Sequence, residues 1–214
     1  MQPRSIKLGL NLILWGIMLM VVLMLATIPF ALLLGSGGKF VVQGLMILNS
    51  GLLIFGYWKY TEPDPGYTGL EASHSARQVA RIAIAVHAAA EVAGFVLLAA
   101  ANVQGSLGGF GGSPLDFLGF LVHVTGLIAW VVQFFAIVRH TRWIAGRVPD
   151  RYIVKRCRSY IWGLPLLSTF GLVLFGLGPL IALVMYWNLL DRLRKHVRSI
   201  ERTGAPAMLP KMHG

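Results

Sequence analysis

Hydrophobic residues along this chain fall into five long runs, and the stretches between them together with the two chain ends hold nearly all of the charged residues. A helix needs about 20 mostly apolar residues to cross the hydrocarbon core of a bilayer. Each run is about this long or longer, so the pattern predicts an all-helical, polytopic membrane bundle. The runs cover residues 8–34, 40–58, 79–101, 115–138 and 161–190.

The first run follows Arg4 and Lys7 and contains no charged residue, as the hydrophobic part of a signal peptide does. That part of a signal peptide has about 7–15 residues, and this run is nearly twice as long. We therefore interpret the run as an uncleaved membrane helix. A bend is expected near Pro29, because proline interrupts the hydrogen bonds of a helix.

The last run is long for one membrane crossing and short for two. Residues 161–190 would extend about 45 Å as one straight helix. Residues 175–179 in its middle read FGLGP, and glycine followed by proline is a strong helix interruption. Proline is tolerated in the first turn of a new helix. The run is therefore either a hairpin of two short helices or one long tilted helix.

Basic residues in the loops favour the hairpin, because Lys and Arg concentrate in cytoplasmic loops. With the N-terminus inside, successive loops alternate between many and few basic residues. A hairpin keeps the basic tail inside and leaves Lys39 as the single external basic residue. We predict six membrane segments, the last two forming a short hairpin, with both termini cytoplasmic in a plasma or inner membrane. The counts along the chain are two in the N-terminus, one, three, none and seven in the loops, and six in the tail.

Composition supports a membrane location and excludes an ordinary soluble globule. Of 214 residues, 56% are hydrophobic and 13% are charged, whereas soluble domains are roughly 45–50% apolar and about 25% charged. This length indicates one domain. We expect a single transmembrane domain over residues 1–190, followed by a basic cytoplasmic helix and tail over residues 191–214.

Apolar residues at helical spacing share one face of this C-terminal helix, with basic residues around them. The pattern suits a helix that lies on an anionic membrane surface. The alternative is a docking helix for a cytoplasmic partner. The four apolar residues are Leu190, Leu193, Val197 and Ile200.

The net charge of +11 would suggest nucleic acid as a partner of a soluble protein. Here the basic residues flank apolar runs, so we expect the lipid bilayer and its anionic headgroups as partners, and no nucleic acid. Other membrane subunits are a further expected class of partner. The predicted headgroup-binding residues are Arg142, Arg147, Arg151, Lys155, Arg156, Arg158, Arg192, Arg194, Lys195 and Arg198.

A few polar residues lie inside the runs, and they are functional candidates because an ionisable group at membrane depth is costly. His87 and Glu91 share one face of the third run at i, i+4 spacing. Counting along each run puts Glu91 nearly level with His123, and His87 about 9 Å from His123. Asn49 falls near the membrane midplane in the second run. These four residues form an intramembrane polar cluster if the runs are neighbours.

Three interpretations of this cluster are open. It can fix helix packing, because polar residues link helices in membrane bundles. It can bind protons or cations, since a Glu beside His exchanges protons, and His87, Glu91 and His123 are also ligand types for a transition metal. It can hold haem b between His87 and His123, although the offset of about 9 Å is unfavourable. No other cofactor is predicted.

No motif indicates an enzyme. The glycine-rich residues 105–113 lack the Lys-Ser or Lys-Thr of a phosphate-binding loop. A G-x-S-x-G elbow is absent, and Cys157 is the single cysteine. We therefore expect a small integral membrane protein that carries out ion- or proton-coupled transport through the Glu/His site. The alternatives are a non-catalytic accessory or scaffold subunit of a membrane complex, and a haem-binding redox subunit.

Overall fold

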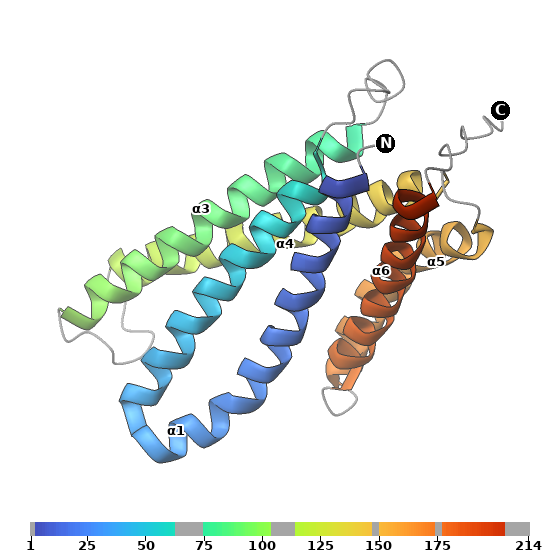
Figure 1. The fold of residues 1–214 in the computed structure, drawn as a ribbon. Helices are drawn as coiled ribbons and strands as arrows, with labels where there is room; N and C mark the ends of the chain where they lie inside the picture. The colour runs from blue at the N-terminus through green and yellow to red at the C-terminus, as the bar shows by residue number, and fades with distance from the viewer. Residues whose placement is uncertain (1–2, 63–74, 104–113, 147–149, 174–176, 204–214) are drawn as a thin grey trace.

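The computed structural model is all-helical over the residues that it describes, which are 3–62, 75–103, 114–146, 150–173 and 177–203. Long helices run up and down the molecule and are joined at its two ends (Figure 1). This arrangement agrees with the all-helical class predicted from the sequence. The helices are α1 (Pro3–Tyr60), α3 (Ser75–Val103), α4 (Pro114–Ala145), α5 (Arg151–Val173) and α6 (Leu177–Thr203).

Helix α1 doubles back on itself, as the blue and cyan segments of Figure 1 show. A first arm, residues 3–26, lies beside a second arm, residues 41–60. Gly9 meets the backbone of Tyr60, and Gly16 meets the side chain of Leu53. The first two hydrophobic runs are therefore two antiparallel arms, and Pro29, where we expected a bend, lies between them.

Glycine allows the two arms of α1 to come close together. A Cβ atom on Gly9 would lie 2.4 Å from the Tyr60 nitrogen and 2.8 Å from the Gly56 carbonyl oxygen. A Cβ on Gly16 would lie 2.6 Å from the Leu53 side chain. Small residues permit such close approach of helices in membrane proteins, so Gly9 and Gly16 determine how the arms fit.

The last hydrophobic run is divided between two helices, α5 and α6, which lie side by side in Figure 1. Helix α6 begins at Leu177, so Gly178 and Pro179 occupy its first turn, where a proline has no hydrogen bond to lose. The chain therefore forms two helices here, and the single long helix is wrong. Residues 174–176, at the interruption, lie outside the described residues.

Three helical segments are long and apolar enough to cross a membrane. They belong to the first arm of α1, to α3 and to α4. By length and composition they account for three of the six predicted crossings. Helices α5 and α6 differ because each combines an apolar half with a strongly basic half. The three segments are Arg4–Ala26, Ala76–Leu97 and Phe117–Ala145.

The buried core lies toward one end of the bundle. Most of the buried side chains come from the two ends of α1, the end of α4, the first half of α5 and the middle of α6. Leu190, Leu193 and Val197 of α6 are fully buried in this core. Their apolar face therefore contacts the protein, and the prediction that it lies on a membrane surface is wrong. A pattern of apolar residues alone does not distinguish a helix that contacts lipid from one that contacts protein.

The single cysteine belongs to the same core. The Cys157 side chain is fully buried among residues of α4, α5 and α6. Burial raises the pKa of the Cys157 thiol to about 12. Because the thiolate is the reactive form of cysteine, Cys157 is chemically inert at neutral pH.

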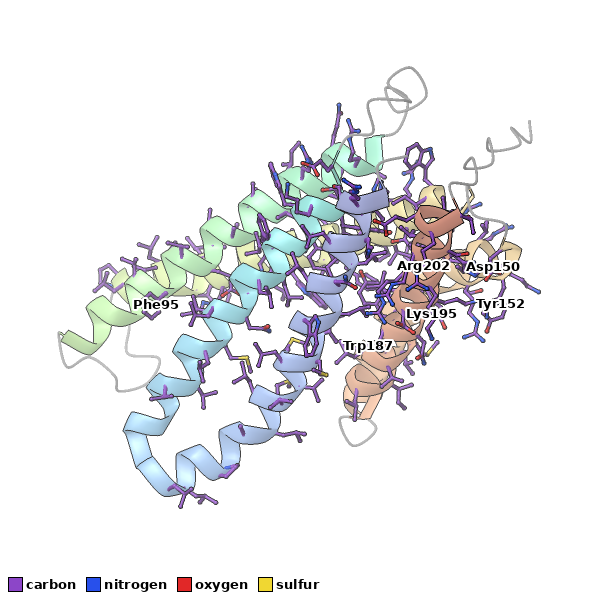
Figure 2. All side chains as sticks on the ribbon, in the orientation of Figure 1. Phe95, Asp150, Tyr152, Trp187, Lys195 and Arg202 are labelled. Atoms are coloured by element: carbon purple, nitrogen blue, oxygen red, sulfur yellow. The ribbon has the colours of Figure 1, made fainter. Side chains whose placement is uncertain are left out.

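Charged residues link the helices at the core end. Asp150, just before α5, accepts hydrogen bonds from Arg192 Nε at 2.7 Å and from the Tyr152 backbone N–H at 3.0 Å. Its Oδ2 lies 3.0 Å from His196 Nε2. Asp150 and Tyr152 lie beside α6 in Figure 2. On the other side of α6, Lys7 pairs with Glu201 at 2.7 Å. These contacts tie α6 to α5 and to α1.

The predicted headgroup-binding residues remain a prediction. Several of them take part in contacts within the protein. Arg192 and Arg156 both stack on the Tyr152 ring, with centroid distances of 4.4 and 4.6 Å. Arg194 donates to Asn11 at 3.3 Å. Arg147 lies outside the described residues.

We expect Asp150→Asn to lower the melting temperature of the detergent-solubilised protein by roughly 2–4 °C. A shift of this size corresponds to about 1 kcal/mol in a protein of this length. Burial raises the pKa of Asp150, but hydrogen bonds from Arg192, Tyr152 and His196 outweigh it and hold the pKa below its usual range. The contribution is therefore present above about pH 4 and is lost as the pH falls further.

Asp191→Asn is the matched control. Asp191 pairs with Arg194 and Lys195 of its own helix, and such pairs contribute only about 0.2–0.5 kcal/mol each. Differential scanning fluorimetry at pH 7 measures both variants. Equal shifts in the two would contradict a linking role for Asp150.

Candidate functional site

The candidate site lies where α3 and α4 contact each other. A Cβ atom on Gly126 would lie 3.3 Å from Ala90 Cβ. Farther along, a Cβ on Gly94 would lie 3.9 Å from His123 Cε1. Because the two helices are antiparallel (Figure 1), these contacts align the polar residues of α3 with those of α4. Gly94 is thus the residue of α3 that faces His123, and Glu91 lies one turn before Gly94.

His87 is the best-connected member of the site. Its Nε2 lies 3.5 Å from Glu91 Oε1, one turn along α3. Its Nδ1 lies 3.1 Å from Gln133 Oε1 of α4. The His87 side chain is 17% exposed and the Glu91 side chain is 40% exposed. One imidazole ring therefore links a carboxylate on α3 to an amide on α4.

The Gln133 contact decides which nitrogen of His87 carries a proton. An amide oxygen only accepts hydrogen bonds, so His87 Nδ1 must be the donor. In the neutral ring, Nε2 then holds the lone pair that faces Glu91. The Glu91 carboxyl group and His87 Nε2 are therefore positioned to exchange a proton.

His123 has the same arrangement on the other helix. Its Nδ1 lies 3.2 Å from the Gly119 carbonyl oxygen, which can only accept. The His123 Nε2 atom is thus left as the acid–base atom, and the side chain is exposed. Gly94, which faces His123, is three residues beyond Glu91 on α3. His123 accordingly lies near the Glu91 end of the site.

Asn49 occupies a different place in the molecule. Its side chain is buried on the second arm of α1, with Oδ1 directed toward Gly16 of the first arm. Within the part of the chain that the structure describes, Asn49 Oδ1 accepts no hydrogen bond. The structure therefore brings His87, Glu91 and Gln133 together with His123 nearby, and it places Asn49 between the arms of α1.

The site does not match a metal centre or a haem pocket. Among the described residues, no three His, Cys, Asp or Glu side chains are grouped closely enough to hold a metal ion. His123 faces Gly94, which is seven residues from His87 and hence about 10 Å away along α3. Two axial ligands of one haem should be roughly level, so His87 and His123 do not fit that role.

Comparison with models of protein families, with curated proteins and with solved structures finds no match to this chain. The chemistry therefore has to follow from the side chains themselves. A carboxyl group beside an imidazole can take part in proton transfer. Sequence reasoning missed Gln133 as the partner of His87, although the antiparallel register of α3 and α4 would have indicated it.

Proposed function

We propose that this protein moves protons across a membrane, alone or coupled to a small cation, and that Glu91 and His87 carry the proton. The observation behind the proposal is the 3.5 Å contact between Glu91 and His87. Glu91 lies inside a helical segment apolar enough to cross a membrane. Ionisable residues in such segments commonly mark proton or ion pathways.

A proton shared between Glu91 and His87 would make the pair suitable for this role. With one proton, Glu91 and His87 together carry no net charge, which is the least costly state in an apolar environment. A second proton gives a cation, and loss of the proton leaves an anion. The pair can therefore accept or release one proton at Glu91 Oε1 or His87 Nε2, while Gln133 keeps the ring oriented.

We further propose six membrane segments with both termini cytoplasmic. The two arms of α1, α3, α4 and the α5–α6 hairpin would each cross or enter the membrane. Support comes from the arrangement of charge, since the beginning of α1, the end of α4 and the end of α6 meet at one end of the bundle. That basic end would face the cytoplasm and its anionic lipid headgroups.

Cysteine labelling tests this topology. We expect Ser199→Cys, near the end of α6, to resist a membrane-impermeant maleimide in intact cells and to react after permeabilisation. Ser36→Cys, in the polar stretch before Lys39, should react in intact cells. The native Cys157 is buried and gives a low background. Labelling of Ser199→Cys from outside would contradict the cytoplasmic C-terminus.

Proton flux tests the proposed activity. The purified protein is reconstituted into vesicles that contain a pH-sensitive dye, and a potassium gradient with valinomycin sets the membrane potential. We expect acidification of the vesicles well above that of protein-free vesicles. Flux equal to that of protein-free vesicles, with and without added Na⁺ or K⁺ gradients, would contradict the proposal and favour the accessory-subunit hypothesis.

A further inference from the structure

One face of the α3–α4 pair exposes polar groups at the depth of two apolar segments. The Glu91 side chain is 40% exposed, and His123 is exposed on the neighbouring helix. Both residues lie inside segments that are long and apolar enough to cross a membrane. Ionisable side chains in such segments almost always face protein or water, because hydrocarbon solvates them poorly. Something other than lipid must therefore cover this face.

The two exposed groups are chemically complementary. Glu91 supplies a carboxyl group and His123 supplies an imidazole whose Nδ1 is held by Gly119. His123 Nε2 can thus accept a proton from a carboxyl group or donate one to a carboxylate. Within one chain the two residues form no ion pair within 4.0 Å among the described residues. Glu91 of one molecule is therefore a suitable partner for His123 of a second molecule, and His123 of the first is a suitable partner for Glu91 of the second.

We infer that a second copy of this chain covers the face, with Glu91 of each copy beside His123 of the other. A two-fold axis along the membrane normal makes such a contact self-complementary and forms the pair twice. It also keeps both copies in the same orientation. Gly94 is level with His123, and Glu91 is three residues away on α3, so the groups differ in depth by about 4.5 Å. Their side chains can span this difference.

The surroundings of the two residues suit a contact between helices. Phe95, one turn beyond Glu91, is 46% exposed, and Phe120, one turn beyond His123, is 59% exposed. Figure 2 labels Phe95 on α3. A Cβ atom on Gly119 would have no other atom within 4 Å, so the surface of α4 is open there. Phe95 of one copy would meet Phe120 and Gly119 of the other.

The inference rests on the membrane placement proposed above, but it does not depend on proton transport. A dimer that does not conduct protons would retain the Glu91–His123 pairing. Conversely, a conducting monomer would lack it. The vesicle flux of the wild-type protein and the degree of cross-linking are separate measurements, so failure of one proposal is distinguishable from failure of the other.

Disulfide cross-linking between differently tagged copies tests the dimer. One copy carries Phe95→Cys and the other carries Phe120→Cys, and the full-length chains are co-expressed and oxidised in the membrane. We expect at least five times more mixed dimer than for the control pair Val96→Cys and Leu118→Cys. These control positions are about as exposed as the test positions, at 58% and 45%, but lie on other faces of α3 and α4.

A second cysteine pair and single substitutions on α4 test the same contact further. Phe95→Cys with Gly119→Cys should cross-link as well, and Gly119→Cys introduces no clash. In the first pair, His123→Leu should reduce the mixed dimer at least threefold, whereas Thr125→Val, an exposed position on another face of α4, should leave it unchanged. Cross-linking no stronger than in the control, insensitivity to His123→Leu, or cross-linking to a protein of another size would each overturn the inference.

Discussion

The Glu91→Gln variant is expected to move protons at less than one tenth of the wild-type rate in reconstituted vesicles. Glutamine keeps the size of the side chain and one acceptor oxygen, but an NH2 group replaces the other oxygen and the side chain has no acidic proton. His87 Nε2, 3.5 Å from Glu91 Oε1, then loses its exchange partner. Loss of a positioned acid–base group commonly costs a factor of 10² or more, so tenfold is a conservative threshold.

Two controls separate this effect from misfolding. Thr125→Val changes an exposed neighbour on α4 whose hydroxyl bonds only to Leu121 of its own helix among the described contacts, and it should keep wild-type flux. Both variants should elute from size-exclusion chromatography as the wild type does. Wild-type flux in Glu91→Gln would exclude Glu91 as the proton carrier.

The two contacts of His87 have different roles in the proposed proton transfer. Because Gln133 accepts from His87 Nδ1 at 3.1 Å, it determines the tautomer without exchanging a proton itself. Gln133 is therefore a positioning residue, and its loss alters the orientation of the ring. Glu91 and His87 are the groups that hold the proton.

The helices and the positions of the polar residues along them could be predicted from the sequence because both follow from local properties of the chain. Runs of apolar residues predict helices, and the rise per residue places Glu91, His87 and His123 along them. The separation of about 10 Å between His87 and the level of His123 agrees with the 9 Å expected. Gly178 and Pro179 correctly indicated a second helix in the last run.

The partners of each helix face could not be predicted, because they depend on how helices are rotated about their axes. Asn49 is buried on a face that turns toward Gly16 inside α1. Gln133 sits on the face that meets His87. Val197 belongs to an apolar stripe of α6 that contacts the core. Such rotations follow from close contacts between segments far apart in sequence.

The closest of those contacts carries the second large prediction. Gly9→Ala should destabilise the folded protein by about 3 kcal/mol, at the upper end of the cost of an overfilled interior. The added Cβ would lie 2.4 Å from the Tyr60 nitrogen and 2.7 Å from Tyr60 Cα. Both are backbone atoms, so the clash cannot be relieved by rotating a side chain, and the arms of α1 must separate.

Thermal unfolding in detergent measures this effect, and the expected loss lowers the melting temperature by roughly 6–12 °C. Gly51→Ala is the matched control, because it lies on the second arm of α1 where a Cβ meets nothing within 4 Å. Alanine is also favoured over glycine inside a helix by about 1 kcal/mol, so Gly51→Ala should melt at or above the wild-type temperature. The two variants make the same chemical change in one helix, so a similar loss in both would mean that the close contact at Gly9 is not what determines the stability of α1.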